Sequence, residues 1–215
     1  DLGRARLDGY LGGVIGYAQR GYQGVPPEKD LYPHDSLDTY PSLLWSAAAY
    51  VETTKDSAWL VKNYKGIKAW ADRILSDDRD GDGLIESPLS GNSDSWPLKV
   101  TLRPSNWWDT IGFGHKDAYA NAIAFRALEG MAGLARMAGR GSEAARYADA
   151  ARRLKIAYPK TFYNPATGVL AGWKSADGKL HDYYFTFVAG MAATLGLVPE
   201  DMANRVMDRM FAKMR

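Results

Sequence analysis

Three short segments of the chain combine carboxylates with aromatic rings and other polar groups. The segments are residues 32–40, 105–110 and 181–184. Their acids Asp38, Asp109 and Asp182 follow one another at intervals of 71 and 73 residues. Sugars stack their C–H faces on aromatic rings, and two carboxylates in an aromatic-walled cleft are what glycoside hydrolysis requires. The residue types therefore point to chemistry on sugars, and the near-equal intervals indicate a repeated structural unit.

The unit that would position these segments is a pair of helices, the first apolar all round and the second amphipathic. The predicted pairs are residues 41–53 with 57–75, 115–138 with 142–158, and 185–195 with 200–214, after a helix over residues 4–20. Pro159 is expected to end the fourth of the paired helices. Because each apolar helix must be buried against its neighbours, the pairs are expected to form an arc. The sequence predicts an all-α toroid of αα-hairpins, about half of an (α/α)6 barrel, whose long loops bring the three segments to one end.

The domain organisation follows from the same pattern. Residues 1–215 read as a single partial barrel domain, expected to be incomplete at both ends because it begins at Asp1 and stops inside a helical pattern at Arg215. Such an arc leaves apolar inner helices uncovered. The expected partners are therefore the remainder of the barrel or a second copy of the chain.

Composition excludes several function classes. The net charge is +2, the chain has no cysteine, and the basic residues are not clustered, so neither nucleic acid nor a thiolate metal site is expected. No run of 18 apolar residues occurs, so no membrane span is expected. The three histidines lack the paired spacing of zinc hydrolases.

A second acidic cluster follows the predicted helix 57–75. Asp78, Asp80, Asp82 and Gly83 match the first half of a calcium-binding loop, but Leu89 stands at the twelfth position, where that loop needs a bidentate glutamate. A tight loop built from Asx turns explains the same residues. Calcium is thus a possible ligand at this loop, and no cofactor is required elsewhere.

Each acidic residue also has a purely structural interpretation. Asp38, Asp109 and Asp182 stand before predicted helices and could serve only as N-caps. Lys116 and Asp117 either line the cleft or simply begin the next helix.

Several runs of residues resemble a known group of enzymes. The runs are Asp38–Leu44, Asp80–Glu86, Ser105–Asp109, Asp117–Ala122 and Phe125–Leu128. They are similar to the catalytic core of the six-hairpin (α/α)6-barrel glycosidases, over about residues 30–200. Within that superfamily the resemblance is nearest to glycoside hydrolase family 63, family 116 and the glycogen-debranching glucosidases.

The resemblance implies hydrolysis of a glucoside-like bond in an oligosaccharide or glycoside. It places Asp109 as the general acid, Trp107 and Trp108 as walls of a sugar subsite, and Asp35 and Asp38 as ligands of sugar hydroxyls. It also implies that the missing hairpins would hold the base of inverting members, so this chain alone lacks part of the machinery.

Further candidates for sugar binding come from the same loops: Tyr40, Lys116, Asp117, Asp182 and Tyr183. Two other functions remain open at this point. One is a helical scaffold or glycan-binding fragment without chemistry. The other is a uronate lyase on the same barrel, for which His181 beside Tyr183 or Tyr184 is the one indication.

Overall fold

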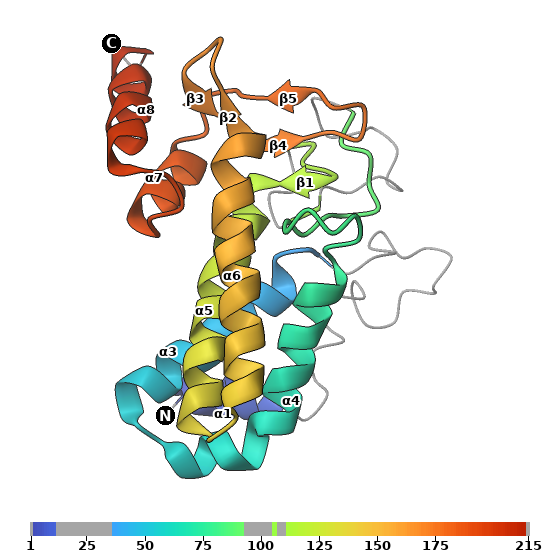
Figure 1. Ribbon diagram of the computed structural model, residues 1–215, viewed down its shortest axis with the longest axis vertical. Helices are drawn as coiled ribbons and strands as arrows, with labels where there is room; N and C mark the ends of the chain where they lie inside the picture. Colours follow the sequence, from blue (N-terminus) through green and yellow to red (C-terminus); the bar gives the residue numbers. More distant parts are fainter. Residues whose placement is uncertain (1, 12–35, 93–104, 107–110, 214–215) are drawn as a thin grey trace.

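A computed structural model describes residues 2–11, 36–92, 105–106 and 111–213 (Figure 1). Three αα-hairpins make up most of it: α3 (Thr39–Thr54) with α4 (Ser57–Ser76), α5 (Ala118–Met137) with α6 (Gly141–Phe162), and α7 (Thr186–Thr194) with α8 (Glu200–Lys213). The predicted all-α hairpin architecture is confirmed. In the described part of the chain, no helix is both long enough and apolar enough to cross a membrane.

The first helix of each hairpin forms the inner layer. Helix α5 packs against both α3 and α7, while α4, α6 and α8 each pack on their own hairpin partner. The inner pair α3 and α5 approach closely at Gly130, where an added Cβ would lie 2.6 Å from the Cβ of Ala48. Small residues at this contact let the two helix backbones lie side by side.

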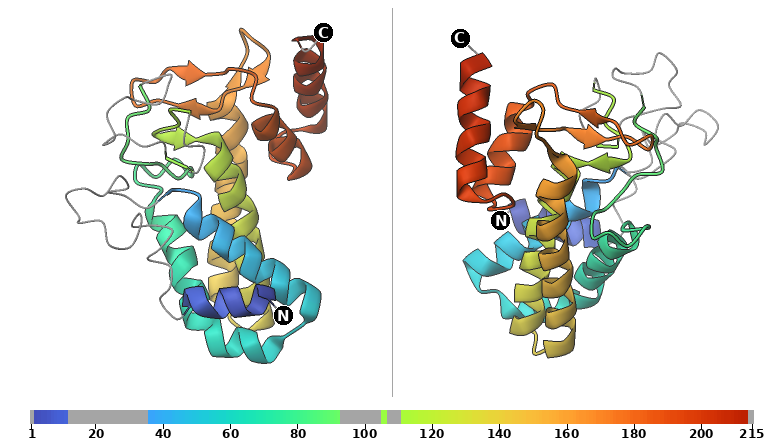
Figure 2. Two further views of the ribbon diagram at one scale, coloured as in Figure 1. Left: turned by 180° about the vertical axis from the view of Figure 1, so that it is seen from behind. Right: turned by 45° about the horizontal axis from the view of Figure 1, so that its top comes forward.

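A short helix, α1 (Leu2–Gly9), lies across the end of the first hairpin that is remote from the strands (Figure 2). The indole Nε1 of Trp59 in α4 donates to the Asp8 carboxylate at 2.8 Å. Only this first part of the predicted helix over residues 4–20 falls within the described residues.

Helix α6 runs through Pro159 and ends at Phe162, so the prediction that Pro159 ends it is wrong. Proline removes one backbone hydrogen bond from a helix interior. Here Tyr158 and Phe162 are completely buried and their ring centroids lie 4.8 Å apart. Burial of these two rings outweighs the lost hydrogen bond.

Five two-residue strands lie beyond the end of α5 at which that helix begins, beside the hairpin of α7 and α8 (Figure 1). An antiparallel sheet has the order β1-β4-β5, and a separate hairpin pairs β2 with β3. The strands are β1 (Lys116–Asp117), β2 (Tyr163–Asn164), β3 (Val169–Leu170), β4 (Trp173–Lys174) and β5 (Leu180–His181). In the sheet, Asp117 is opposite Trp173 and Trp173 is opposite His181. The sheet thus ties the entry of α5 to the segment that leads into α7.

Candidate active site

The entries to the three inner helices meet at one end of the hairpins. The amide of Leu37, just before α3, donates to the carbonyl of Ser105 at 2.6 Å, and the Ser105 amide donates to the Phe113 carbonyl at 2.9 Å. The Phe113 ring lies 5.0 Å from Trp173 and 5.4 Å from Phe185, the residue before α7. The predicted convergence of the three loops is therefore confirmed for their described parts.

Four predicted site residues lie outside the described residues: Asp35, Trp107, Trp108 and Asp109. Ser105 and Asn106, which directly precede the last three in the chain, are described and almost fully buried. The hydrogen bonds that hold Ser105 and Asn106 in place therefore also hold the point in the chain that directly precedes the segment 107–109.

Asp117 is the group that holds Ser105 and Asn106. Its carboxylate accepts hydrogen bonds from the Ser105 hydroxyl at 2.7 Å, from the Asn106 amide at 2.6 Å and, as the N-cap of α5, from the Ala120 backbone amide at 3.1 Å. Burial raises the pKa of this carboxyl to about 6, although the hydrogen bonds act in the opposite direction. Because no part of Asp117 is exposed, it does not line a cleft as predicted, whereas its alternative role as the start of the helix is confirmed.

Tyr119 lies where the first turns of all three inner helices come together. Burial and the negative charges of Asp38 and Asp117 raise the pKa of its hydroxyl. Its ring packs edge-on against Phe187 in α7, with centroids 5.8 Å apart. The buried Asp38 stands at the N-cap position of α3, yet its side chain makes no capping hydrogen bond, so the cap interpretation does not describe its role.

Neither Tyr119 nor Phe187 was predicted as a site residue. The available signal was their position, because both stand near the start of a predicted inner helix. Phe187 also contacts Phe185 at 5.8 Å, and Tyr183 lies 6.1 Å from Phe185. With 53% of its surface exposed, Tyr183 is the most accessible of these rings, and its contact with a sugar stays a prediction.

Tyr40 and Asp182 have partners away from this cluster. The Arg73 guanidinium of α4 lies 5.7 Å from the centre of the Tyr40 ring. The Asp182 carboxylate accepts from the Asn164 amide at 2.8 Å and from the Thr167 hydroxyl, both on the β2–β3 hairpin. Since α7 begins at Thr186, Asp182 is not its N-cap and instead anchors that hairpin.

His181 does not offer a catalytic base for a lyase. Its ring is buried and stacks on Trp173, with centroids 4.3 Å apart and planes 7° from parallel. Its Nε2 lies 3.0 Å from the Ser175 hydroxyl. The histidine of the pattern that favoured a lyase is therefore part of the packing within the sheet.

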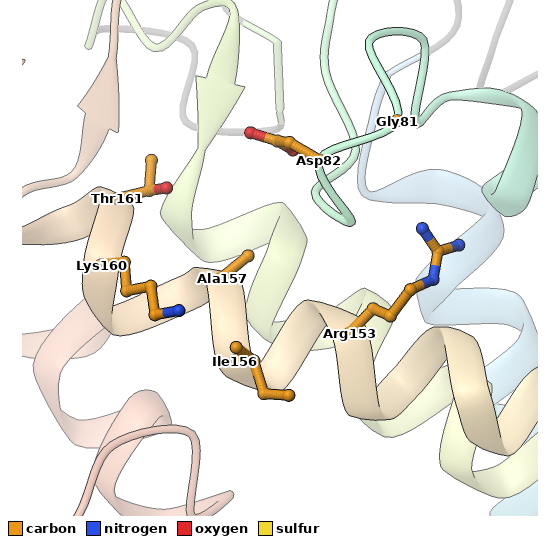
Figure 3. Close-up of a pocket in the computed structure, with 7 residues that line it drawn as sticks. All are labelled: Gly81, Asp82, Arg153, Ile156, Ala157, Lys160 and Thr161. Carbon is orange, nitrogen blue, oxygen red and sulfur yellow. The ribbon is translucent and has the colours of Figure 1, made fainter.

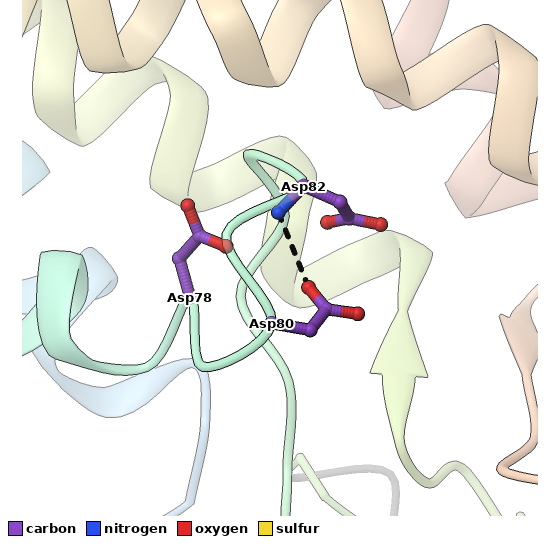
Figure 4. Close-up of side chains that lie close together, drawn as sticks. All are labelled: Asp78, Asp80 and Asp82. Atoms are coloured by element: carbon purple, nitrogen blue, oxygen red, sulfur yellow. Dashed lines mark hydrogen bonds between the residues drawn. The ribbon is translucent and has the colours of Figure 1, made fainter.

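The acidic loop after α4 brings three carboxylates together. Asp78, Asp80 and Asp82 each offer an oxygen within 4.8 Å of the others (Figure 4). The same side chains shape the loop, because they accept hydrogen bonds from backbone amides at 3.2, 3.2 and 3.0 Å. Gly83, at φ +95°, lets the chain pass close to the backbone of Arg153 in α6, 3.2 Å from where a Cβ would be. The Asx-turn interpretation is thus confirmed.

The ammonium of Lys116 lies among these acids. Its Nζ is 2.7 Å from Asp80, 2.5 Å from Asp82 and 3.4 Å from the buried Glu86. Burial alone would lower the pKa of this amine, but the hydrogen bonds and charges of the acids outweigh it, so the pKa is raised and the group stays charged. The ammonium of Lys116 therefore offsets part of the negative charge of Asp80, Asp82 and Glu86. It does not reach the candidate sugar site as predicted.

Calcium is expected to have no effect on stability, because the Lys116 ammonium already stands between Asp80 and Asp82. We expect the Tm measured by differential scanning fluorimetry to be the same in millimolar CaCl2 and in EDTA. A rise of several degrees with calcium and not with magnesium would show that the ion displaces the ammonium.

A pocket of about 350 Å³ separates the acidic loop from α6 (Figure 3). It is lined by Gly81, Asp82, Arg153, Ile156, Ala157, Lys160 and Thr161. Apart from Gly81 and Asp82 its lining comes from the outer helix α6, and it includes none of the predicted sugar-binding residues. This pocket is therefore separate from the candidate active site, which is the cluster of Asp38, Asp117 and Phe187 around Tyr119.

Comparison with known proteins gives the family. The sequence profile of the bacterial alpha-L-rhamnosidase six-hairpin glycosidase domain matches residues 21–215. A search among curated proteins found no significant match.

Two solved structures share the fold. A GH78 family rhamnosidase from Bacillus sp. GL1 superposes with a TM-score of 0.62 at 18% identity, over 87% of this chain and 17% of that one. A rhamnosidase from Klebsiella oxytoca with rhamnose bound gives a TM-score of 0.59 at 14% identity, over 82% of this chain and 30% of that one.

The chain thus spans less than a third of either rhamnosidase. The predicted membership of the six-hairpin glycosidase superfamily is confirmed, whereas the nearer relation to families 63 and 116 finds no support. The chain belongs to the family of bacterial alpha-L-rhamnosidase six-hairpin glycosidase domains.

Proposed function

We propose that this chain forms part of the catalytic domain of a glycoside hydrolase that acts on an α-L-rhamnoside. The observation that carries the proposal is the meeting of the three inner-helix entries around Tyr119, with the stem of the segment 107–109 held beside it by Asp117. The family match supports rhamnose as the sugar, since the matching family is described as a rhamnosidase domain.

In this proposal Asp109 is the general acid that protonates the glycosidic oxygen as the bond breaks. Trp107 and Trp108 stack on the sugar, and Asp35 accepts hydrogen bonds from its hydroxyls, whereas the buried Asp38 acts on the site through its charge beside Tyr119. Hydrolysis also needs a carboxylate that acts as base or nucleophile, and we assign that role to no residue of this chain. The remainder of a barrel or a second copy of the chain is proposed to supply it.

The test is a panel of aryl glycosides that share one leaving group. It is assayed with the purified full-length polypeptide in its assembled form, so that the proposed source of the base is present. We expect the α-L-rhamnoside to be cleaved with a kcat/KM at least about 100-fold above that of the α- or β-D-glucoside. The reason is that glucose differs in ring stereochemistry and carries a 6-hydroxyl where rhamnose has a methyl group.

Two results would overturn the proposal. Faster cleavage of a glucoside would favour the glucosidase relation that the sequence first indicated. Binding of rhamnose in calorimetry without cleavage of any glycoside would favour a glycan-binding fragment.

A further inference from the structure

We propose that Asp117 is a positioning residue, which holds Ser105 and Asn106, and through Ser105 the entry to α3, in one arrangement at the candidate active site. The structural half of the proposal is that Asp117 holds Ser105, Asn106 and the entry to α3, and it does not depend on the proposed function. The catalytic half is that this arrangement is needed for activity, and it rests on the proposed function.

The first argument is that a carboxylate is the side chain that fits this place. Three donors point at Asp117: the Ser105 hydroxyl and the Asn106 amide at Oδ2, and the Ala120 backbone amide at Oδ1. A carboxylate accepts all three, whereas asparagine would turn an NH2 group toward the NH2 of Asn106. A buried donor that loses its acceptor is costly, so we expect the hydrogen bonds that hold Ser105 and Asn106 to be weakened when Asp117 is changed.

The second argument is that the hydrogen bonds continue beyond Ser105. Its carbonyl accepts the amide of Leu37, the residue before Asp38. Asn106 is followed directly in the chain by Trp107, Trp108 and the predicted acid. Asp117 itself is fixed by β1, opposite Trp173 of β4. One buried carboxylate therefore connects the sheet to two of the three entries.

The structural half is tested by hydrogen exchange on Asp117→Asn. We expect the amides of Leu37 and Ser105 to exchange at least about tenfold faster than in the wild type, after normalisation to amides in the middle of α5. The double variant Asp117→Asn with Asn106→Asp exchanges the donor and acceptor, so it should recover the protection even if the single variant folds poorly.

Tyr158→Phe is the matched control. Its hydroxyl donates to the carbonyl of Ala118, the first residue of α5, at 3.1 Å and is equally buried, and this hydrogen bond does not involve Ser105 or Asn106. This variant should lose stability and leave the exchange of Leu37 and Ser105 unchanged after the same normalisation.

The catalytic half is tested by kinetics on an aryl α-L-rhamnoside well below the Tm of each variant. A displacement of about 1 Å in a catalytic group costs on the order of 100-fold in rate. We expect Asp117→Asn to lower kcat by about that factor with KM changed less than about threefold, and the double variant to regain at least tenfold. Tyr158→Phe should keep the wild-type kcat.

Three outcomes would count against the positioning role. Unchanged exchange in Asp117→Asn would show that its carboxylate does no more than cap α5. An equal loss of kcat in Tyr158→Phe would show a general effect of destabilisation. Failure of the double variant to recover either quantity would show that the hydrogen bond to Asn106 is not the cause. If the wild type cleaves no rhamnoside, the proposed function fails, and the exchange experiment still decides the structural half.

Discussion

Replacing Asp109 with asparagine is expected to lower kcat on a phenyl α-L-rhamnoside by about 1,000-fold while the protein stays folded. The amide is close in size to the carboxylic acid but has no proton to give to the leaving oxygen. The measurement is steady-state kinetics, with circular dichroism to show that the fold is retained.

The leaving group separates acid catalysis from other roles of Asp109. A dinitrophenolate departs without protonation, so the loss with a dinitrophenyl rhamnoside should be smaller than with the phenyl one by at least about tenfold. Asp208→Asn, on the exposed face of α8, is the control and should keep full activity. A loss that is the same for both substrates would contradict the assignment of the acid.

Replacing Lys116 with methionine is expected to lower the free energy of unfolding by about 3 kcal/mol. The substitution keeps the length of the side chain but leaves Asp80, Asp82 and the buried Glu86 facing one another without a cation. Because the first two carboxylates are about half exposed, most of the loss should come from Glu86, whose pKa burial already raises. Urea unfolding monitored by tryptophan fluorescence gives the value.

Two further variants make that result specific. Lys68→Met removes a cation from an ion pair with Asp72 in which both partners are about one-third exposed, and Asp72 keeps Arg146 of α6 at 3.0 Å, so the change should cost no more than about 1 kcal/mol. Adding Glu86→Gln to Lys116→Met should return part of the loss, since it removes the buried charge. Equal losses in the free energy of unfolding for Lys116→Met and Lys68→Met would mean that burial of the Lys116 ammonium adds nothing to stability.

The helices were predictable because each carries its own signal. The apolar spacing in 57–75 predicts α4 to within a residue of its observed bounds, and Asp56 is found to cap it. Helix α6 was predicted too short, because the effect of Pro159 is local while the burial of Tyr158 and Phe162 depends on the rest of the fold.

The site was less predictable, and Lys116 with Asp117 shows why. Adjacent side chains on an extended strand point in opposite directions. One therefore reaches the acidic loop and the other reaches Ser105 and Asn106. A strand of two residues is too short to show this alternation in the sequence, and partners that lie 11 to 36 residues away leave no periodic trace.

The contact between Gly130 and Ala48 bears on the width of the whole arc. In a ring of hairpins, the distance between neighbouring inner helices determines the circumference, and therefore the diameter of the opening at which a substrate enters. Helices that meet through glycine and alanine give a narrow ring. The close approach of α3 and α5 at their middles thus narrows the described arc at a place remote from the candidate active site.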